Sequence, residues 1–474
     1  MFFSVYTLGC KLNQLETEAI ADSFSRGGFT LVPWNAKPGS KEPSSTEAEI
    51  LIINTCTVTS MAEQKARRVI RKALRDNPEA CLIVTGCYAQ MEKIALCALG
   101  ENSDRFFIVP GEKKDSLLDL PKILSGAGSG KNTSFPGSTL PGLIGSWALS
   151  LTSEAESKNP FRFQPEKFSS HSRSFLKIQD GCDRHCAYCR VSLARGKSQS
   201  LGAKEVLGAL KSLEQKGFAE VVLTGVNIFQ YRDGNLTLPG LLEFLLTETE
   251  SIRIRLSSIE LETDFMSGDF CRVLENKRIR PHFHLSVQSF SDRILSKMRR
   301  PYTAGDLVNA VNMLRSVKED PFLACDIIAA FPGETEEDFK ETFELCKKTG
   351  FAWIHAFSFS PRPGTEAFDF SPRVNDKEAA RRVALLTELA WEGRLKYIQN
   401  WEGKEVEAVV EAGKREVNGF VPGVSENYLK LLINYGTGPA PNPGSLVRCR
   451  ILSRSKDSPE LEKCNFDAEA EIII

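Results

Sequence analysis

The sequence lacks long hydrophobic runs: none of its 474 residues lies in a stretch of eighteen consecutive apolar residues. A helix that spans a membrane needs about that many, so we expect no membrane-spanning segment. The first residues, MFFSVYTLGCKLNQ, also lack a basic region followed by an apolar core of signal-peptide length. They are typical of a strand that leads into a helix. We therefore expect a cytoplasmic protein.

The chain also lacks a charge imbalance, because 60 Lys and Arg residues face 61 Asp and Glu residues, for a formal net charge of −1. Global charge therefore gives no sign of a nucleic-acid partner, and only local clusters of basic residues can do so. Hydrophobic residues make up 42% of the chain and charged residues 26%, as in ordinary folded proteins. The length favours two or three domains.

A fourth cysteine is missing from the motif DGCDRHCAYC, which contains Cys182, Cys186 and Cys189. Structural zinc sites usually have four protein ligands, often from two C-x2-C pairs. Three thiolates on a [4Fe–4S] cluster would instead leave one iron open for a substrate molecule. A zinc half-site or a chance spacing is the alternative. In a chain without a secretion signal, metal or redox chemistry is a more common use of cysteine than disulfides.

A second set of three cysteines follows three predicted strands. Cys10 comes after FFSVYTLG, Cys56 ends EILIINTC, and Cys87 ends CLIVTGC. The carboxyl ends of parallel strands lie at one edge of a sheet, where ligands bind, so these thiols are expected to converge. The alternative is that each is a small buried hydrophobic residue. We assign that structural role to Cys81, which begins a strand.

The pattern of segments predicts an α/β protein. In residues 1–122 strands alternate with helices, which predicts a parallel sheet covered by helices. Residues 123–168 contain a stretch rich in Gly, Ser and Pro and are expected to form a linker. Residues 169–400 contain six strand candidates separated mostly by helices, which favours a complete or partial β/α barrel over an open doubly wound sheet. Residues 401–474 have short strands typical of a small all-β barrel.

Ten segments of these two regions are predicted to be strands. Those of the central region are SFLKIQ, AEVVLTG, IRIRLSS, HFHLSVQ, FLACDII and WIHAFSF, and those of the last region are EVEAVVE, YLKLLIN, LVRCRIL and AEAEIII.

Nearly the whole chain resembles the radical S-adenosylmethionine (SAM) methylthiotransferase family. The motifs that carry the resemblance are TLGCKLNQLET, INTCTVT, GCYAQ, QDGCDRHCAYC, LARGKSQS, LTGVN, RLSSIE, HLSVQS, DIIAAFPGET and SPRPGT. The resemblance implies an enzyme that inserts a methylthio group into an unactivated C–H bond, with two [4Fe–4S] clusters and SAM as cofactors. Such a bond is too strong for a side-chain base to activate, so no catalytic residue is expected beyond the cluster ligands.

The resemblance also implies roles for particular residues. Cys182, Cys186 and Cys189 would hold the cluster whose open iron binds SAM and starts a 5′-deoxyadenosyl radical. Cys10, Cys56 and Cys87 would hold an auxiliary cluster that delivers the sulfur, which a second SAM methylates. The SAM-binding candidates lie at barrel strand ends, where polar residues also serve as simple caps, and they are Thr224, Gly225, Asn227, Ser258, Glu260 and Gln288.

The segment LGCKLNQLET is most similar to the branch of the family that acts on N6-threonylcarbamoyladenosine. It predicts a methylthio group on C2 of that base at tRNA position 37. The alternative substrates are isopentenyladenosine-37 of tRNA and an aspartate of a ribosomal protein.

Two departures from the family pattern stand out: Phe290 replaces a common Gly, and residues 190–192 replace an apolar pair and Pro. A flavodoxin or ferredoxin is expected to supply electrons.

The expected RNA partner is the tRNA anticodon loop. Arg67 and Arg71 belong to a basic helix after Cys56 that is either a phosphate contact or simply a solvated face. Arg195 and Lys197 follow the radical motif and are further candidates. The last domain resembles the RNA-binding TRAM module, yet residues 401–474 contain nine basic and twelve acidic residues. It is therefore expected to contribute shape and a few contacts, without bulk electrostatic attraction.

Overall fold

The computed structural model describes residues 1–34, 43–100, 103–127, 139–151, 159–166, 173–412, 419–452 and 466–473. Within these ranges no helix is both long and apolar enough to cross a membrane. The chain forms two compact units. The first comprises residues 1–169, 180–184 and 189–197, and the second comprises residues 170–179, 185–188 and 198–474.

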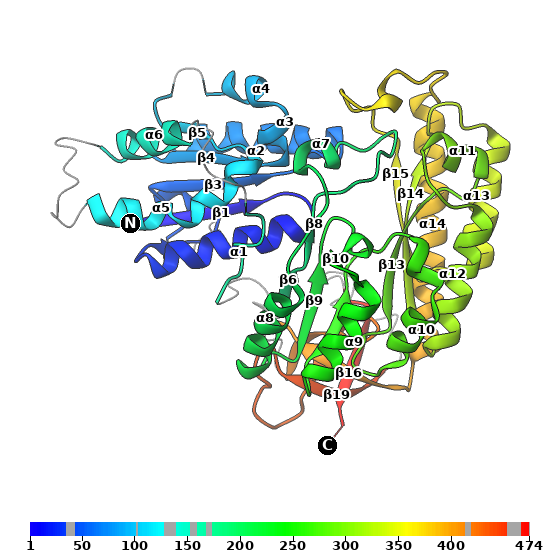
Figure 1. Ribbon diagram of the computed structural model, residues 1–474. Helices are drawn as coiled ribbons and strands as arrows, with labels where there is room; N and C mark the ends of the chain where they lie inside the picture. Colours follow the sequence, from blue (N-terminus) through cyan, green and yellow to red (C-terminus); the bar gives the residue numbers. More distant parts are fainter. Residues whose placement is uncertain are drawn as a thin grey trace. The chain divides into compact units, whose positions relative to one another are not determined.

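A five-stranded parallel sheet with the order β2-β1-β3-β4-β5 is the centre of the first unit (Figure 1). Its strands are β1 (Phe2–Thr7), β2 (Thr30–Leu31), β3 (Ile50–Thr55), β4 (Cys81–Gly86) and β5 (Phe106–Ile108). All neighbouring strands in it pair in parallel. The predicted N-terminal parallel α/β fold is therefore confirmed.

Helices connect these strands. They are α1 (Lys11–Arg26), α2 (Ser60–Asp76), α3 (Cys87–Met91), α4 (Lys93–Cys97), α5 (Leu120–Ala127) and α6 (Leu140–Ser150), with the 3-10 helices η1 (Ser45–Glu47) and η2 (Gly111–Leu118). The end of α5 and the whole of α6 belong to the segment 123–168 that was expected to be a linker. Ile144 and Trp147 of α6 pack into the core of the sheet, so this part of the segment belongs to the first unit. Residues 128–138 lie outside the described residues.

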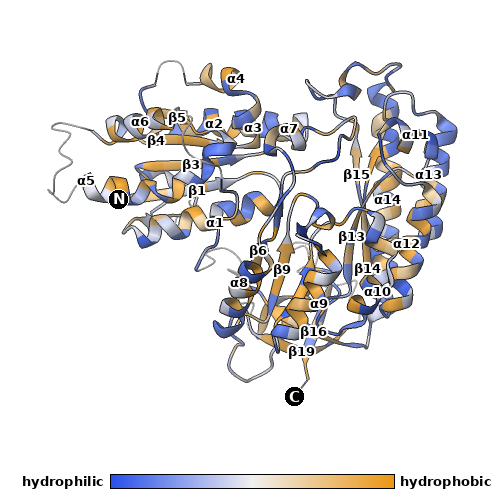
Figure 2. Ribbon diagram, in the orientation of Figure 1, coloured by the Kyte–Doolittle hydropathy of each residue, from blue (hydrophilic) through white to orange (hydrophobic). Residues whose placement is uncertain are grey.

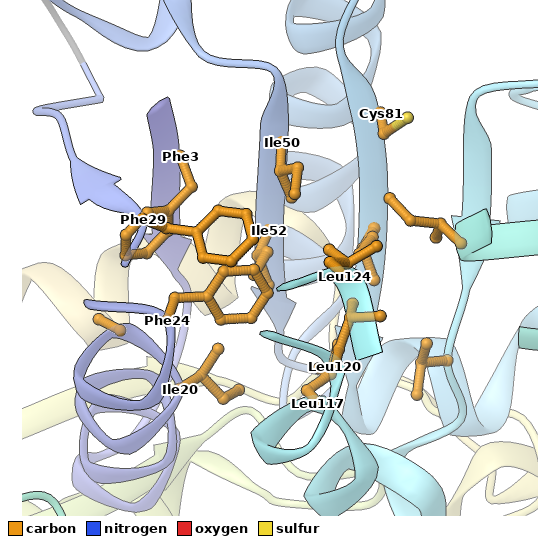
Figure 3. Packing of buried hydrophobic residues seen from close by; sticks show 14 of the residues in the cluster. Phe3, Ile20, Phe24, Phe29, Ile50, Ile52, Cys81, Leu117, Leu120 and Leu124 are labelled. Carbon is orange, nitrogen blue, oxygen red and sulfur yellow. The ribbon is translucent and has the colours of Figure 1, made fainter. Parts of the chain in front are cut away.

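Cores on both faces of the sheet explain why the first four residues of β3, 50–53, are all apolar. Phe3 and Phe24 pack with ring centroids 5.1 Å apart, beside Ile50 and Ile52 of β3 (Figure 3). The intervening residues of β3 face a second core on the other side of the sheet. A strand buried on both faces needs a continuous run of apolar residues. Cys81 is fully buried in the first of these cores, in agreement with its predicted structural role.

The second unit contains six parallel strands in sequential order. They are β6 (Ser174–Lys177), β9 (Glu220–Thr224), β12 (Arg253–Leu256), β13 (His282–Gln288), β14 (Phe322–Ala329) and β15 (Trp353–Ser358). They form two three-stranded sheets, β12-β9-β6 and β13-β14-β15, which are joined by bridges from Ile254 to Ile279 and from Ile259 to Leu285. Sequential order is typical of a β/α barrel, whereas doubly wound sheets reverse direction at a switch point. The predicted partial barrel is confirmed.

The main helices of this region are α8 (Ala203–Gln215), α9 (Leu238–Glu248), α10 (Gly268–Glu275), α11 (Asp292–Lys297), α12 (Ala304–Val317), α13 (Glu336–Thr349) and α14 (Asp376–Trp401). Local sequence fixes their ends. Thr335 and Asp338 form a capping box at the start of α13, and Gly350 ends it with φ +64°. Figure 2 shows hydrophobic residues along β9 and hydrophilic ones along much of α13, as expected for a buried strand and a helix with a solvated face.

The last domain is a closed barrel of five strands in the order β16-β17-β18-β20-β19. The strands are β16 (Glu405–Val410), β17 (Phe420–Ser425), β18 (Lys430–Asn434), β19 (Leu446–Ile451) and β20 (Ala468–Ile472). The predicted all-β fold is confirmed, but β17 was missed. Its sequence, FVPGVS, contains Pro422 and Gly423, which normally interrupt strands.

This small barrel packs against the amino ends of the six parallel strands. Phe322 at the start of β14 shares a hydrophobic core with Leu431 of β18. Arg255 donates to the carbonyl oxygen of Ser425 at 3.1 Å and to the Glu220 carboxylate at 2.7 Å. The small barrel is therefore a fixed part of the second unit, at the end opposite the carboxyl ends of the strands.

Candidate active site

Three cysteines follow three neighbouring strands of the first unit. Cys10 precedes α1, Cys56 directly follows β3, and Cys87 follows β4 and begins α3. Because β1, β3 and β4 are adjacent and parallel, these positions share one edge of the sheet. Burial, with smaller contributions from the nearby Cys10 and Cys87, raises the pKa of the Cys56 thiol to about 12. The structure therefore brings the three predicted residues together.

Small and polar residues hold these loops close to one another. Gly9 has φ +102°, and a Cβ atom there would lie 2.7 Å from the Cβ of Cys56. No other residue type fits that contact. The amide nitrogen of Asn13 donates to the carbonyl oxygens of Leu8 at 2.8 Å and Thr55 at 3.0 Å. The motifs LGCKLN and NTC therefore form one packed site.

Over the described part of the chain, no group of three or more His, Cys, Asp or Glu side chains has the arrangement that a single metal ion requires. In an iron–sulfur cluster each thiolate binds a different iron, so cluster ligands lie farther apart than the ligands of one ion. Cys10, Cys56 and Cys87 are all free thiols. Their soft sulfur atoms and their placement on three strand ends fit a cluster better than a zinc ion.

The radical motif begins with a tight loop within the first unit. Gly181 has φ +72°, and a Cβ atom there would lie 2.0 Å from the carbonyl oxygen of Lys197. The backbone N–H of Cys182 donates to the carbonyl oxygen of Gly196 at 3.0 Å. The sulfur of Cys182 accepts the N–H of Arg184 at 3.4 Å. These backbone contacts hold the loop of Cys182 and its sulfur in place.

Arg300 was not predicted from the sequence, although it contacts one of the predicted cluster ligands. Its Nη1 donates to the sulfur of Cys186 at 3.2 Å and lies 3.1 Å from Oε1 of Glu260. The guanidinium also donates to the carbonyl oxygen of Ser286 at 2.8 Å and to the Tyr302 hydroxyl at 2.6 Å. Nothing in MRRPYT distinguishes this arginine from its neighbour, so only the fold reveals it.

Three SAM-binding candidates lie at the end of β9. Thr224 is its last residue. A Cβ atom on Gly225 would lie 2.8 Å from Oε1 of Gln179, and the same oxygen accepts the backbone N–H of Asn227 at 2.9 Å. The Asn227 side chain donates to Glu260 at 3.1 Å. The structure thus joins the LTGVN and SSIE segments at the carboxyl ends of the barrel strands.

Ser258 and Gln288 lie at the ends of the next strands. The hydroxyl of Ser258 is 3.0 Å from Nδ1 of His284, and Nε2 of that ring is 3.1 Å from the Asp326 carboxylate. Gln288 ends β13 with φ +70°, a backbone conformation that is uncommon for a residue with a side chain. All six SAM-binding candidates therefore lie near the carboxyl ends of β9, β12 and β13.

Arg195, one of the candidate RNA contacts, lies inside the protein. It is only 8% exposed, and it donates to Glu16 and Asp180 at 3.0 Å each and to Asn13 at 3.0 Å. Burial opposes the cation, but Asp180 and Glu16, with Cys87 and Cys10 nearby, raise the pKa of Arg195 well above its ordinary value. Its guanidinium is therefore used inside the protein and is not available to a phosphate.

The other basic candidates have a different environment. Lys197 is exposed. Arg71 is also exposed on α2, whereas Arg67 is half-buried and donates to the Tyr88 hydroxyl at 2.7 Å. A shallow hollow on this helix is lined by Gln64, Arg67, Arg68, Arg71, Lys72 and Arg75. The surface of α2 is therefore strongly basic at this place.

Phe290, one of the two departures from the family pattern, belongs to the core. Its ring is fully buried and lies 6.3 Å from that of Phe351, measured between centroids. Its backbone N–H donates to the hydroxyl of Thr342 on α13 at 3.1 Å. The larger side chain thus packs between β13 and the helical layer.

Two family models match the chain. One is the radical SAM superfamily, over residues 176–346, and the other is the uncharacterized protein family UPF0004, over residues 3–107. A threonylcarbamoyladenosine tRNA methylthiotransferase MtaB from Treponema pallidum is 42% identical, covering 94% of this chain and 97% of the relative. The chain belongs to the radical SAM methylthiotransferase family. It is an enzyme that transfers a sulfur-containing group, and [4Fe–4S] clusters and SAM are the cofactors of its family.

Further relatives extend this result. The MtaB protein of Aquifex aeolicus is 33% identical over 90% of this methylthiotransferase and 95% of the relative. A tRNA-2-methylthio-N(6)-dimethylallyladenosine synthase from Anaplasma phagocytophilum is 28% identical over 96% of this chain and 97% of the relative. Among solved structures, the radical SAM methyltransferase TsrM from Kitasatospora setae matches with a TM-score of 0.50 and 14% identity, covering 77% of this chain and 76% of that one. That likeness concerns the fold alone.

Proposed function

We propose that this enzyme adds a methylthio group to C2 of N6-threonylcarbamoyladenosine at position 37 of tRNA. The observation that carries the proposal is the 42% identity to the Treponema pallidum relative of that name over nearly the full length of both chains. The residues Lys11, Leu12 and Asn13 after the first cysteine agree with the same branch of the family.

We assign the cluster ligands as two sets of three thiols. Cys182, Cys186 and Cys189 would hold the cluster that binds SAM, and Cys10, Cys56 and Cys87 would hold the auxiliary cluster. When bound, the clusters and SAM supply the electron, the hydrogen-atom abstraction and the sulfur that an unactivated C–H bond requires. The convergence of three strand ends and the Arg300 contact to Cys186 support this assignment.

The protein's own task is then to bind, orient and exclude water. Thr224, Gly225, Asn227, Ser258, Glu260 and Gln288 are the proposed SAM contacts. Their shared hydrogen bonds, such as that from Asn227 to Glu260, would hold polar groups in fixed directions around the cofactor. A fixed environment suits radical chemistry because it limits side reactions.

For the RNA we propose contacts from Lys197, Arg67 and Arg71 to phosphates of the anticodon loop. The C-terminal barrel is proposed to be TRAM-like and to add a few contacts. The proposed domain limits are 1–122, 169–400 and 401–474, with 123–168 between the first two. We further infer that the enzyme works in the cytoplasm with a flavodoxin or ferredoxin as electron donor.

Isopentenyladenosine-37, which is also called dimethylallyladenosine-37, is the second candidate substrate. A synthase for its methylthio derivative is 28% identical over 96% of this chain. An aspartate of a ribosomal protein is the third.

Nucleoside mass spectrometry separates these possibilities. The gene is expressed in a bacterial host that lacks its own methylthiotransferases, and both tRNA nucleosides and ribosomal proteins are analysed. We expect the 2-methylthio derivative of threonylcarbamoyladenosine in cells with the wild-type gene and not in cells with the Cys56→Ala variant. The 2-methylthio derivative of isopentenyladenosine alone, or methylthio-aspartate alone, would overturn the proposal.

A further inference from the structure

Arg190, the first residue of the second departure from the family pattern, is buried inside the first unit. This residue directly follows Cys189 and is 5% exposed. Its Nη2 donates to Glu92 at 2.8 Å and its Nη1 to Glu63 at 3.4 Å. Glu63 lies in the first turn of α2, and Glu92 follows α3. The helix that follows Cys56 and the residue that ends the helix begun by Cys87 thus supply the two carboxylates.

Glu63 continues this network towards the other set of cysteines. The hydroxyl of Thr57 donates to Oε1 of Glu63 at 2.5 Å. Thr57 is 1% exposed and directly follows Cys56. A continuous polar chain therefore connects the residue after one proposed ligand of the radical cluster with the residue after one proposed ligand of the auxiliary cluster.

Stability alone is a poor reason for such a chain. Two charges removed from water are costly, and a buried ion pair often adds nothing to stability when compared with apolar residues of similar size. A better-attested use of buried charges is to fix the polypeptide in one arrangement. The family resemblance described above implies an apolar pair and Pro at residues 190–192. Here an arginine is present together with the two carboxylates that compensate its charge.

We propose that the Arg190–Glu63–Thr57 chain positions the segment carrying Cys189 against the auxiliary cysteine loop. Arg190 is a positioning residue, since no atom of it needs to touch a cofactor or substrate. This inference rests on the proposed function, in which a radical made at one site must react beside a sulfur delivered at the other. A displacement of about 1 Å in a reacting pair can slow a reaction about a hundredfold. This network of hydrogen bonds would therefore control how much methylthio product forms for each SAM that is cleaved.

Anaerobic assays of the reconstituted full-length enzyme with Arg190→Gln, Arg190→Lys and Glu63→Gln test the proposal. The control is Arg381→Gln on α14, because Arg381 also pairs with two glutamates, Glu336 and Glu378, but is exposed. Two quantities are measured: methylthio nucleoside formed per 5′-deoxyadenosine, and hydrogen exchange of residues 189–197 in the metal-free protein. For Arg190→Gln we expect a ten- to hundredfold lower product ratio, faster exchange in that segment and unchanged iron content.

The remaining variants sharpen the test. Arg190→Lys should recover part of the product ratio, because it keeps the charge but loses the second donor. The double variant Arg190→Gln with Glu63→Gln removes both charges from the interior, so it should fold like wild type and still give the low ratio. An unchanged ratio with unchanged exchange in Arg190→Gln would overturn the inference. Equal losses of SAM cleavage and product, or loss of iron, would overturn it too, since they indicate a role in cluster assembly.

The two proposals fail in different ways. If the wild-type enzyme methylthiolates none of the tRNAs tested, the proposed function is wrong, whereas exchange in residues 189–197 still decides whether Arg190 holds this segment. If the wild-type enzyme gives product and Arg190→Gln behaves like Arg381→Gln in both measurements, only the inference about Arg190 is wrong.

Discussion

Asn13 donates a hydrogen bond from its side-chain amide to the carbonyl oxygen of Thr55, at 3.0 Å. The bond joins the loop of Cys10 to that of Cys56. The oxygen of the same amide accepts from Arg195 at 3.0 Å. Asn13 was used above as a marker of substrate branch, but its contacts are with the protein itself. Its structural role is therefore to hold the loops of Cys10 and Cys56 together.

Replacing Asn13 with Ala should weaken the auxiliary site. The change leaves two buried carbonyl oxygens and one Arg195 nitrogen without this partner, and each such loss costs about 1–3 kcal/mol. We expect lower stability in urea and a loss of up to half of the bound iron after reconstitution. Asn77→Ala, which removes an amide at the end of α2, is the control. Full iron content in Asn13→Ala would contradict the prediction.

The two sets of cysteines should fail differently. Cys186→Ala is expected to abolish SAM cleavage, whereas Cys56→Ala should retain cleavage to 5′-deoxyadenosine and lose methylthio transfer. Each should reduce the iron content from roughly eight atoms to roughly four. Cys97→Ala, at an exposed free thiol, should change nothing. If Cys186→Ala and Cys56→Ala lost the same activities, the division of labour between the clusters would be wrong.

Regular patterns made most of the fold predictable. Alternating strands and helices indicated the parallel sheet of the first unit and the parallel strands of the partial barrel, and the strand ends indicated where Cys10, Cys56 and Cys87 would meet. Side-chain pairing was not predictable in the same way. Arg195 was a candidate RNA contact because it follows the radical motif, but Glu16, 179 residues earlier in the chain, provides a buried partner for it. Sequence proximity carries no information about such long-range ion pairs.

The RNA contacts proposed for Lys197 and Arg71 predict a change in salt dependence. Each phosphate contact contributes about 0.9 to the slope of log affinity against log salt concentration for a duplex and about 0.7 for a single strand. Lys197→Gln and Arg71→Gln should therefore each weaken tRNA binding and reduce the slope by roughly that amount. Filter binding at several salt concentrations measures both. The control is Lys211→Gln on α8, because Lys211 is also exposed but pairs with Glu248. Equal slopes in all three variants would exclude the proposed contacts.

Glu220 should make the stability of the second unit sensitive to acid. Burial alone would raise the pKa of this carboxyl, but Arg255, Arg280 and Arg173 lower it to about 2. A carboxyl with a lowered pKa in the folded state stabilises the protein above its unfolded pKa of about 4.3 and loses that effect as the pH falls towards 2. The free energy of unfolding should therefore fall between about pH 4.5 and pH 2, and less steeply in Glu220→Gln. At pH 7 that variant should be less stable by about 3–5 kcal/mol. Identical pH profiles would contradict this assignment.

Removing the C-terminal barrel should damage the radical SAM region itself. A chain ending at residue 400 would expose Phe322 and Tyr397, which share a core with the barrel, and would remove the carbonyl of Ser425 from Arg255. Loss of tRNA binding after this truncation would therefore reflect misfolding as much as a lost RNA contact. We expect the truncated chain to aggregate or to unfold at a lower temperature, as thermal unfolding and gel filtration will show. A soluble truncated chain with the wild-type melting temperature would contradict this view.

Surface variants of the intact enzyme test the RNA role of the barrel without that damage. Lys430 and Arg448 are exposed on β18 and β19, so their replacement by Gln leaves the core unchanged. Because residues 401–474 carry more acidic than basic side chains, we expect no bulk attraction to RNA there. We expect each variant to weaken tRNA binding about threefold or less, well below the tenfold change that corresponds to about 1.4 kcal/mol. A larger loss with a reduced salt slope would show that these few cations form a principal phosphate contact.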